Sequence, residues 1–158
     1  MAKKRRKRKN SKLVHSHMRS FRKRNKKSNL LPQDTRFVHQ PTDQIKLSEA
    51  IQELVALYRH EANTEAAYDK LIGMAVLAWN TTLMSPDKQA ESLNFIQNLE
   101  DDPEMQKIIL EIVQELMVRK LALYPDVDRI IVDYQVTDVG HSFHLSIISS
   151  IPEGADLP

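Results

Sequence analysis

Leu71-Ile-Gly-Met-Ala-Val-Leu-Ala-Trp79 is the stretch of sequence that decides the fold of this chain. Its residues are apolar nearly all the way round a helical projection, and Asn63 or Thr64 stands upstream as a candidate N-cap. A helix that is apolar on every side has to be surrounded by other elements. The sequence therefore predicts a central, buried helix that begins after Asn63 or Thr64 and ends near Trp79.

The segment before the central helix has the pattern of an amphipathic helix. Leu47, Ile51, Leu54 and Tyr58 keep a helical spacing, while acidic and amide residues occupy the other faces. One apolar stripe with a polar opposite face is typical of a helix that covers a core. We therefore predict one continuous helix over residues 44–60.

Two further helices are predicted after the central one, because each has a start signal. Ser85-Pro86 and Asp102-Pro103 both place a capping residue before a proline at the first helical position. The first of these helices is expected to end near residue 99 and the second near residue 121. Arg119 and Lys120 then lie in the last turn, where cations interact favourably with the helix dipole.

Beyond residue 125 the pattern changes from helix to strand. Residues 129–136 and 142–148 are rich in β-branched and aromatic residues, and the five residues between them include Gly140. This pattern predicts a β-hairpin. Alternation places these apolar residues on its core face: Ile130, Val132, Tyr134, Val136, Phe143, Leu145 and Ile147. A lone two-stranded hairpin is marginal in water, so this face is expected to lie on the helices or on a partner's sheet.

The predicted fold class is α+β, with about four helices packed with a C-terminal β-hairpin and preceded by a disordered basic tail. Residues 1–28 form this basic tail, and residues 29–42, with two prolines, read as a linker. Residues 43–152 are the predicted globular domain, and residues 153–158 are a C-terminal tail. A domain of this length can bury a core without disulfides.

Charge is distributed very unevenly along the chain. The basic tail, residues 1–28, holds fourteen bases and no acid, whereas residues 29–158, the acidic body, hold nine bases and 21 acids. The net charge of +2 therefore combines a tail of +14 with a body of −12. A cationic block repels itself, stays solvated and binds polyanions by releasing their counterions.

The candidate nucleic-acid-binding residues are the bases of the basic tail and two side chains with aromatic rings. They are Lys3, Lys4, Arg5, Arg6, Lys7, Arg8, Lys9, Lys12, His17, Arg19, Phe21, Arg22, Lys23, Arg24, Lys26 and Lys27. Residues 2–10 lack apolar surface and are expected to be disordered when free. Over residues 11–27, Val14, Met18 and Phe21 fall at i, i+4 and i+7, which predicts a basic amphipathic helix on the target.

RNA or a ribonucleoprotein is the favoured target, and DNA stays an alternative. His17 and Phe21 can stack on unpaired bases, and Arg22 and Arg24 can pair with phosphate or guanine in a bidentate way. In composition the basic tail resembles those of ribosomal and ribosome-associated proteins. The acidic body is expected to bind a protein partner or to fold back on its own tail. These features predict a non-enzymatic adaptor.

A second interpretation assigns the main function to the acidic body and not to the basic tail. The acidic helical body would then carry the function as a regulatory protein-interaction module, and the basic tail would be accessory or a localisation signal. The helix-then-hairpin order is compatible with an exposed hairpin edge that accepts another strand. No feature of the sequence sets the oligomeric state.

Catalytic and metal sites are not favoured by the residue pattern. Without cysteine, disulfides, thiolate zinc sites and a cysteine nucleophile are excluded. His60-Glu61 has Thr64 where a zinc-protease helix needs a second histidine. Asp133, His141 and His144 could share the polar face of the hairpin, which gives a minor interpretation as an enzyme. We expect no cofactor and no metal.

The expected location is the cytoplasm, with nucleoid or nucleus as alternatives. No apolar run is long enough to span a membrane, and the basic start lacks the apolar region of a secretory signal.

Overall fold

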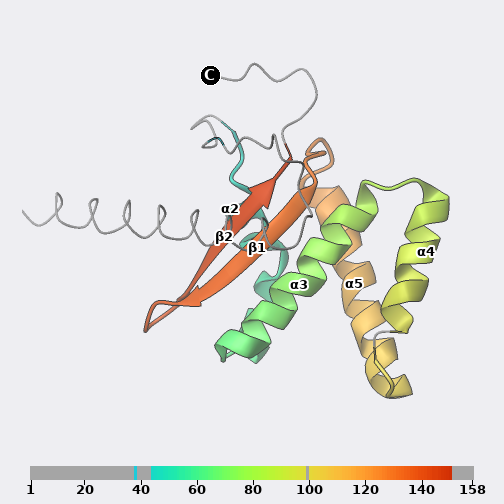
Figure 1. The fold of residues 1–158 in the computed structure, drawn as a ribbon, viewed down its shortest axis with the longest axis horizontal. Coiled ribbons are helices and arrows are strands. Elements are labelled where there is room, and N and C mark those ends of the chain that lie inside the picture. The colour runs from blue at the N-terminus through green and yellow to red at the C-terminus, as the bar shows by residue number, and fades with distance from the viewer. Residues whose placement is uncertain (1–37, 39–43, 99, 151–158) are drawn as a thin grey trace, which may run out of the picture. The chain divides into compact units, whose positions relative to one another are not determined.

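The computed structural model describes Val38, residues 44–98 and residues 100–150. The chain divides into two units, Met1–Gln44 and Ile45–Pro158, and the described helices and strands belong to the second. They are α2 (Leu47–Leu54), the 3-10 helix η1 (Ala56–Glu61), α3 (Glu65–Thr82), α4 (Pro86–Gln97), α5 (Pro103–Leu123), β1 (Ile131–Asp138) and β2 (Phe143–Ser149) (Figure 1). The predicted α+β class, with helices followed by an antiparallel hairpin, is confirmed.

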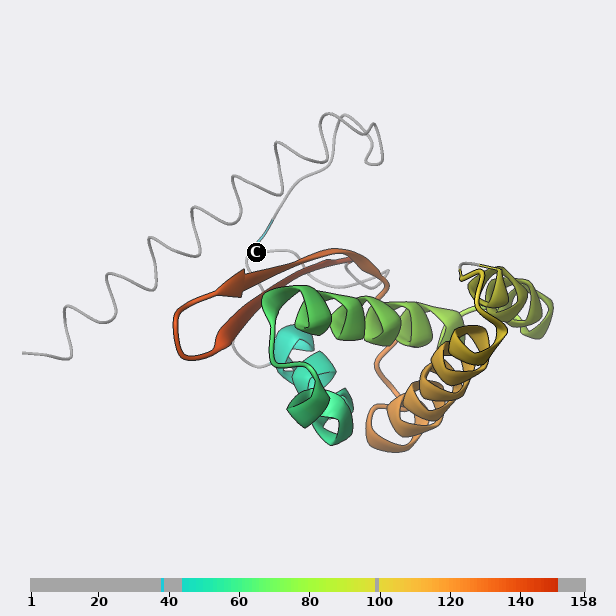
Figure 2. The same cartoon turned by 90° about the horizontal axis from the view of Figure 1, so that it is seen from below.

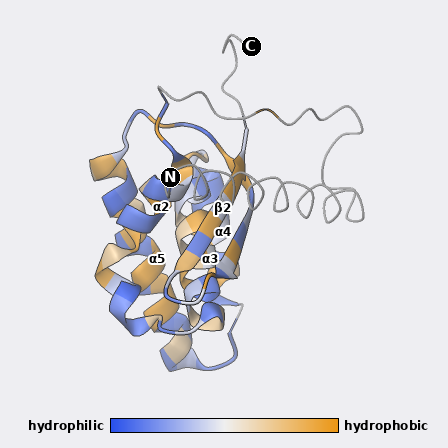
Figure 3. Cartoon of the chain, turned by 90° about the vertical axis from the view of Figure 1, so that its left-hand side faces the viewer, coloured by the Kyte–Doolittle hydropathy of each residue, from blue (hydrophilic) through white to orange (hydrophobic). Residues whose placement is uncertain are grey.

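Helix α3 is the centre of this unit, as its apolar sequence predicts. It contacts α2, α4, α5 and β1. Its fully buried residues include Ile72, Ala75, Ala78 and Trp79. Figure 2 shows α2 and α3 on the same side of the hairpin, α2 beneath β2 and α3 along β1. Hydrophilic residues lie among hydrophobic ones along α5, which has one side on the core (Figure 3).

The predicted starts of α3, α4 and α5 are confirmed, whereas α2 starts at Leu47, three residues later than predicted. The Thr64 hydroxyl caps α3 by accepting from the Ala67 backbone N–H at 3.1 Å. The Asp102 carboxylate caps α5 by accepting from the Glu104 N–H at 3.0 Å. At α4 the proline signal holds, although the Ser85 side chain makes no capping hydrogen bond.

The continuous helix predicted over residues 44–60 is wrong. Helix α2 ends at Leu54, Val55 leaves the α conformation with φ −89° and ψ 2°, and the chain continues as η1. A tertiary contact lies at this point. The Arg119 guanidinium of α5 donates to the Leu54 and Glu53 carbonyls, both at 3.2 Å, and so stabilises the end of α2 at this point.

The core face predicted for β1 is wrong at its beginning. Ile131 is 3 % exposed, whereas Ile130 and Val132 are 51 % and 41 % exposed. The register explains the change, because Ile131 pairs with Ser149 and Asp133 already pairs with Ile148. Val132 is therefore the extra residue of a β-bulge, and a bulge reverses which alternate residues face the core.

Beyond the bulge the prediction is correct. Val136 and Leu145 are buried opposite each other, and Tyr134 pairs with Ile147. The connection between the strands is Val139 to Ser142, two residues later than predicted at its start. Gly140 takes a positive φ of 96°, which suits glycine in a tight connection.

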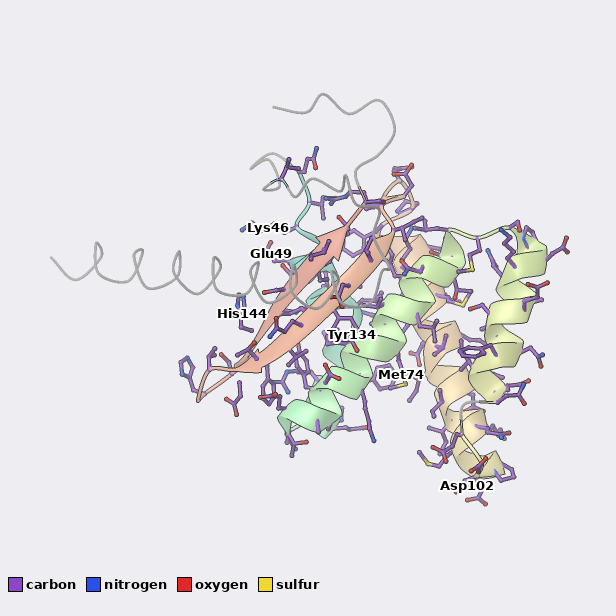
Figure 4. All side chains as sticks on the ribbon, viewed as in Figure 1. Lys46, Glu49, Met74, Asp102, Tyr134 and His144 are labelled. Carbon is purple, nitrogen blue, oxygen red and sulfur yellow. The ribbon has the colours of Figure 1, made fainter. Side chains whose placement is uncertain are left out.

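Helix α3 holds β1 through three side-chain contacts along its length. The Asn80 amide donates to the Ile131 carbonyl at 2.8 Å and accepts from the Ile131 N–H at 2.9 Å. Near the other end, the Glu65 carboxylate accepts from the Asp138 N–H at 3.1 Å. Between these two contacts, the Tyr134 side chain extends from β1 towards α3 (Figure 4). Its hydroxyl packs closely on Gly73, because a Cβ added to that glycine would lie only 2.9 Å from the hydroxyl oxygen.

Candidate functional site

The structure leaves the candidate nucleic-acid-binding residues untested. All of them, from Lys3 to Lys27, lie outside the described residues, as do the linker except Val38 and the whole C-terminal tail, residues 153–158. The described residues instead show how the acidic body arranges its own charges. This arrangement is the candidate functional feature.

The acidic body turns cations inward and acids outward. Residues 44–150 hold 17 acids and 8 bases. Among the described residues, the buried charged side chains are Lys120 and Arg129, and no acid is buried. The surface is therefore more acidic than the residue count alone indicates.

Lys120 is 1 % exposed and lies inside the body. Its ammonium donates to the Val127 carbonyl at 2.9 Å and lies 5.0 Å from the centre of the Trp79 ring. Burial lowers the pKa of the Lys120 ammonium, and the carboxylates of Asp128 and Asp126 oppose that shift. The lysine thus connects α5 with the segment that leads into the hairpin.

Arg129 joins that segment to the start of the body. Its guanidinium donates to the Ile45 carbonyl, and its own carbonyl accepts from the Trp79 indole N–H at 2.9 Å. Burial lowers the pKa of Arg129, which Asp128 partly offsets. A cation that satisfies a buried carbonyl acts as a structural donor and is not available to contact a partner at the surface.

Two more arginines are directed to backbone carbonyls. Arg119 donates to the end of α2, as described above. Arg59 donates to the Ala62 carbonyl at 2.8 Å, and its guanidinium lies 4.6 Å from the Tyr68 ring centre and 5.0 Å from that of Phe143. Arg119 therefore makes its hydrogen bonds to the end of α2, while Lys120 is the base in the last turn of α5.

The acids of the described residues are neutralised only weakly. Exposed lysines form two ion pairs there, Lys46 with Glu49 at 3.2 Å and Lys107 with Glu111 at 3.9 Å. Lys46 is the N-cap residue of α2, and Glu49 lies in the first turn of that helix (Figure 4). Such exposed pairs contribute little free energy and compete poorly with water. The body therefore presents a net negative surface.

Two acids accept hydrogen bonds from tyrosine hydroxyls. Tyr58 donates to Glu115, and Tyr124 donates to Glu53. Burial, together with the hydrogen bond and charge of the carboxylate, raises the pKa of each tyrosine to about 12. The tyrosines join η1 to α5 and the end of α5 to α2, so these contacts are structural.

The structure does not bring Asp133, His141 and His144 together. His144 pairs with Thr137, four residues along the same strand face from Asp133, which is about 13 Å at roughly 3.3 Å per residue. His141 is exposed in the hairpin connection. His60 is an exposed residue of η1, 3.5 Å from Glu61. No group of three potential metal ligands occurs among the described residues.

Sequence patterns did not predict the hydrogen bonds of Asn80 and Arg129, because their partners are 51 and 84 residues away in the chain. Lys120 had a readable signal. It follows Val113 and Leu116 on the buried stripe of α5. A lysine in such a position is expected to bury its stem.

None of the helices among the described residues is long and apolar enough to cross a membrane. No protein-family model, no curated protein and no solved structure matches the chain.

Proposed function

We propose that this protein is a non-enzymatic adaptor that binds RNA, free or in a ribonucleoprotein, through its basic tail and a protein partner through its acidic body. The observation that carries the proposal is the separation of charge. Fourteen bases and no acid occupy residues 1–28. In the described part of the body, the buried charges are cations and the acids remain at the surface.

The two surfaces suit different partners. Lysine and arginine contacts to phosphate provide affinity without reading sequence, and stacking of Phe21 or His17 adds a preference for unpaired bases. Residues 44–150 hold 17 acids against 8 bases, two of which are buried, so their surface repels the same polyanion and suits a neutral or cationic protein surface. We place this activity in the cytoplasm, the location expected from the sequence.

The test is the salt dependence of RNA binding by the full chain. Arg22, Lys23 and Arg24 replaced together by Gln should reduce the slope of log K against log salt by about 2, because each contact to a single strand contributes about 0.7. The matched control replaces Lys70, Lys88 and Lys107, three exposed cations of the body, by Gln. Fluorescence anisotropy with a labelled single-stranded RNA measures both.

The control triple variant should keep the wild-type slope. A slope that falls equally in both variants would contradict the assignment of RNA binding to the basic tail. No measurable RNA binding by the wild type would favour the second function, a regulatory protein-interaction module. Tighter binding to double-stranded DNA would change the target and keep the role of the tail.

A further inference from the structure

The outer edge of β1 is closed by α3. In an antiparallel pair, residues alternate between directing their backbone groups to the partner strand and directing them away. Ile131 and Asp138 direct backbone groups away from β2, and side chains of α3 form hydrogen bonds with them. The Asn80 amide bonds the N–H and the carbonyl of Ile131, and the Glu65 carboxylate accepts from the Asp138 N–H. A strand from another molecule therefore cannot add to this edge without displacing α3.

No described helix or strand covers the outer edge of β2. Asp138 faces Phe143, Val136 faces Leu145 and Tyr134 faces Ile147 in the register. Because the Asp138 N–H points away from β2, the same alternation directs the backbone groups of Phe143, Leu145 and Ile147 away from β1. In the part of the chain that the structure describes, no hydrogen bond reaches these outward groups.

Strand β2 also lacks the residues that keep an edge from pairing. Phe143–Ser149 reads Phe-His-Leu-Ser-Ile-Ile-Ser and contains no Lys, Arg, Asp, Glu, Pro or Gly. Natural edge strands are commonly protected by charges, prolines or bulges. The bulge of this hairpin lies on β1, the strand that α3 already covers. Among the described residues, the strand without these protections is thus the one whose outer edge no helix covers.

We propose that the edge of β2 is a self-association site, where β2 of a second copy pairs antiparallel to form a continuous four-stranded sheet. A two-fold axis at Ser146 makes the full strands overlap. Leu145 then faces Ile147 of the second copy as a hydrogen-bonded pair, and Ser146 faces its own counterpart as a non-hydrogen-bonded pair. Such isologous pairing is the commonest symmetry of homodimers.

The charge distribution favours a second copy over an acidic or strongly basic strand. The seam holds no Lys, Arg, Asp or Glu, so no ion pair between such residues has to be desolvated within it. Pairing of Leu145 with Ile147 would also extend the apolar layer over α2. The two acidic bodies still repel each other at longer range, and added salt screens that repulsion. Self-association should therefore strengthen with salt, whereas RNA binding weakens.

The experiment uses the nuclease-treated full chain in analytical ultracentrifugation. The wild type should sediment as a dimer, and S146K and S146E should each sediment as monomers, because like charges meet at the two-fold axis. An equimolar mixture of S146K and S146E should recover the dimer, since opposite charges then face each other. The matched control is T137K, a substitution on the same face of β1, which should leave the dimer intact.

A second variant keeps the test independent of folding defects. The chain has no cysteine, so S146C introduces a single thiol. At the two-fold axis the two Cα atoms would lie about 4.5 Å apart, within the range of a disulfide. Mild oxidation should cross-link S146C into a covalent dimer and leave T137C uncross-linked.

A monomeric wild type, or equal cross-linking of S146C and T137C, would overturn the proposal. A dimer that S146K and S146E both leave intact would place any self-association elsewhere and would equally overturn it. The proposal does not depend on RNA binding, because its readouts are mass and cross-linking in the absence of nucleic acid.

Discussion

Asn80 is the single residue that most directly fixes the hairpin to the helices. Its side-chain amide donates to the Ile131 carbonyl and accepts from the Ile131 N–H, the two bonds that a neighbouring strand would otherwise form. Because Ile131 is buried, neither group can be satisfied by water once the amide is removed. The position therefore depends on the side chain of asparagine and not only on its helical propensity.

Replacing Asn80 by Ala should lower the free energy of unfolding by about 1–3 kcal/mol, the cost of leaving a buried polar group unsatisfied. Urea unfolding followed by circular dichroism measures the change. The control is Asn94→Ala on α4, an exposed asparagine that should cost no more than about 0.5 kcal/mol. Equal effects at the two positions would refute the role given to Asn80.

Tyr58 and Tyr124 should make the body sensitive to alkaline pH. Their pKa is about 12 in the folded protein against an ordinary value of 10.0, so the folded state keeps both protons longer than the unfolded state does. Their contribution to stability is complete below about pH 10 and is lost as pH rises towards 12. Urea midpoints measured across this range should fall, and Tyr58→Phe combined with Tyr124→Phe should reduce the fall. An unchanged pH profile in the double variant would exclude the tyrosines as its source.

At the scale of elements, features set by neighbouring residues could be predicted from the sequence, whereas features that accompany distant contacts could not. Helix starts were readable, because Thr64 and Asp102 act on N–H groups two or three residues away. The end of α2 and the bulge at Val132 were not. The first coincides with hydrogen bonds from Arg119, 65 residues away, and Ile131 beside the bulge is held by Asn80, 51 residues away. The periodicity of apolar residues within one helix or strand predicts neither contact.

Arg119→Met should therefore destabilise the junction between α2 and η1. The methionine keeps much of the stem but loses the donors to the Leu54 and Glu53 carbonyls, and we expect a cost of about 1–3 kcal/mol in urea unfolding. Lys107→Met on the same helix removes only an exposed ion pair and should cost less than about 1 kcal/mol. If the two variants are equally stable, the end of α2 does not depend on Arg119.

At the scale of the whole molecule, charge composition predicts a division of labour between the basic tail and the acidic body. Composition gives the sign of the net charge of each part, because a count of charged residues does not depend on the fold. It cannot show that Lys120 and Arg129 are buried on backbone carbonyls, since that depends on how the helices pack. Because these cations face inward, we expect the body to bind nucleic acid less well than its sequence alone indicates.

The most direct measurement compares RNA binding by the full chain and by residues 29–158 alone, at several salt concentrations. Urea unfolding first checks that removal of residues 1–28 leaves the cooperative transition nearly unchanged, as expected for a tail with little apolar surface. The full chain should bind single-stranded RNA with an affinity that falls steeply with salt, and the shortened chain should show no measurable binding. Tight RNA binding by the shortened, folded chain would contradict the account.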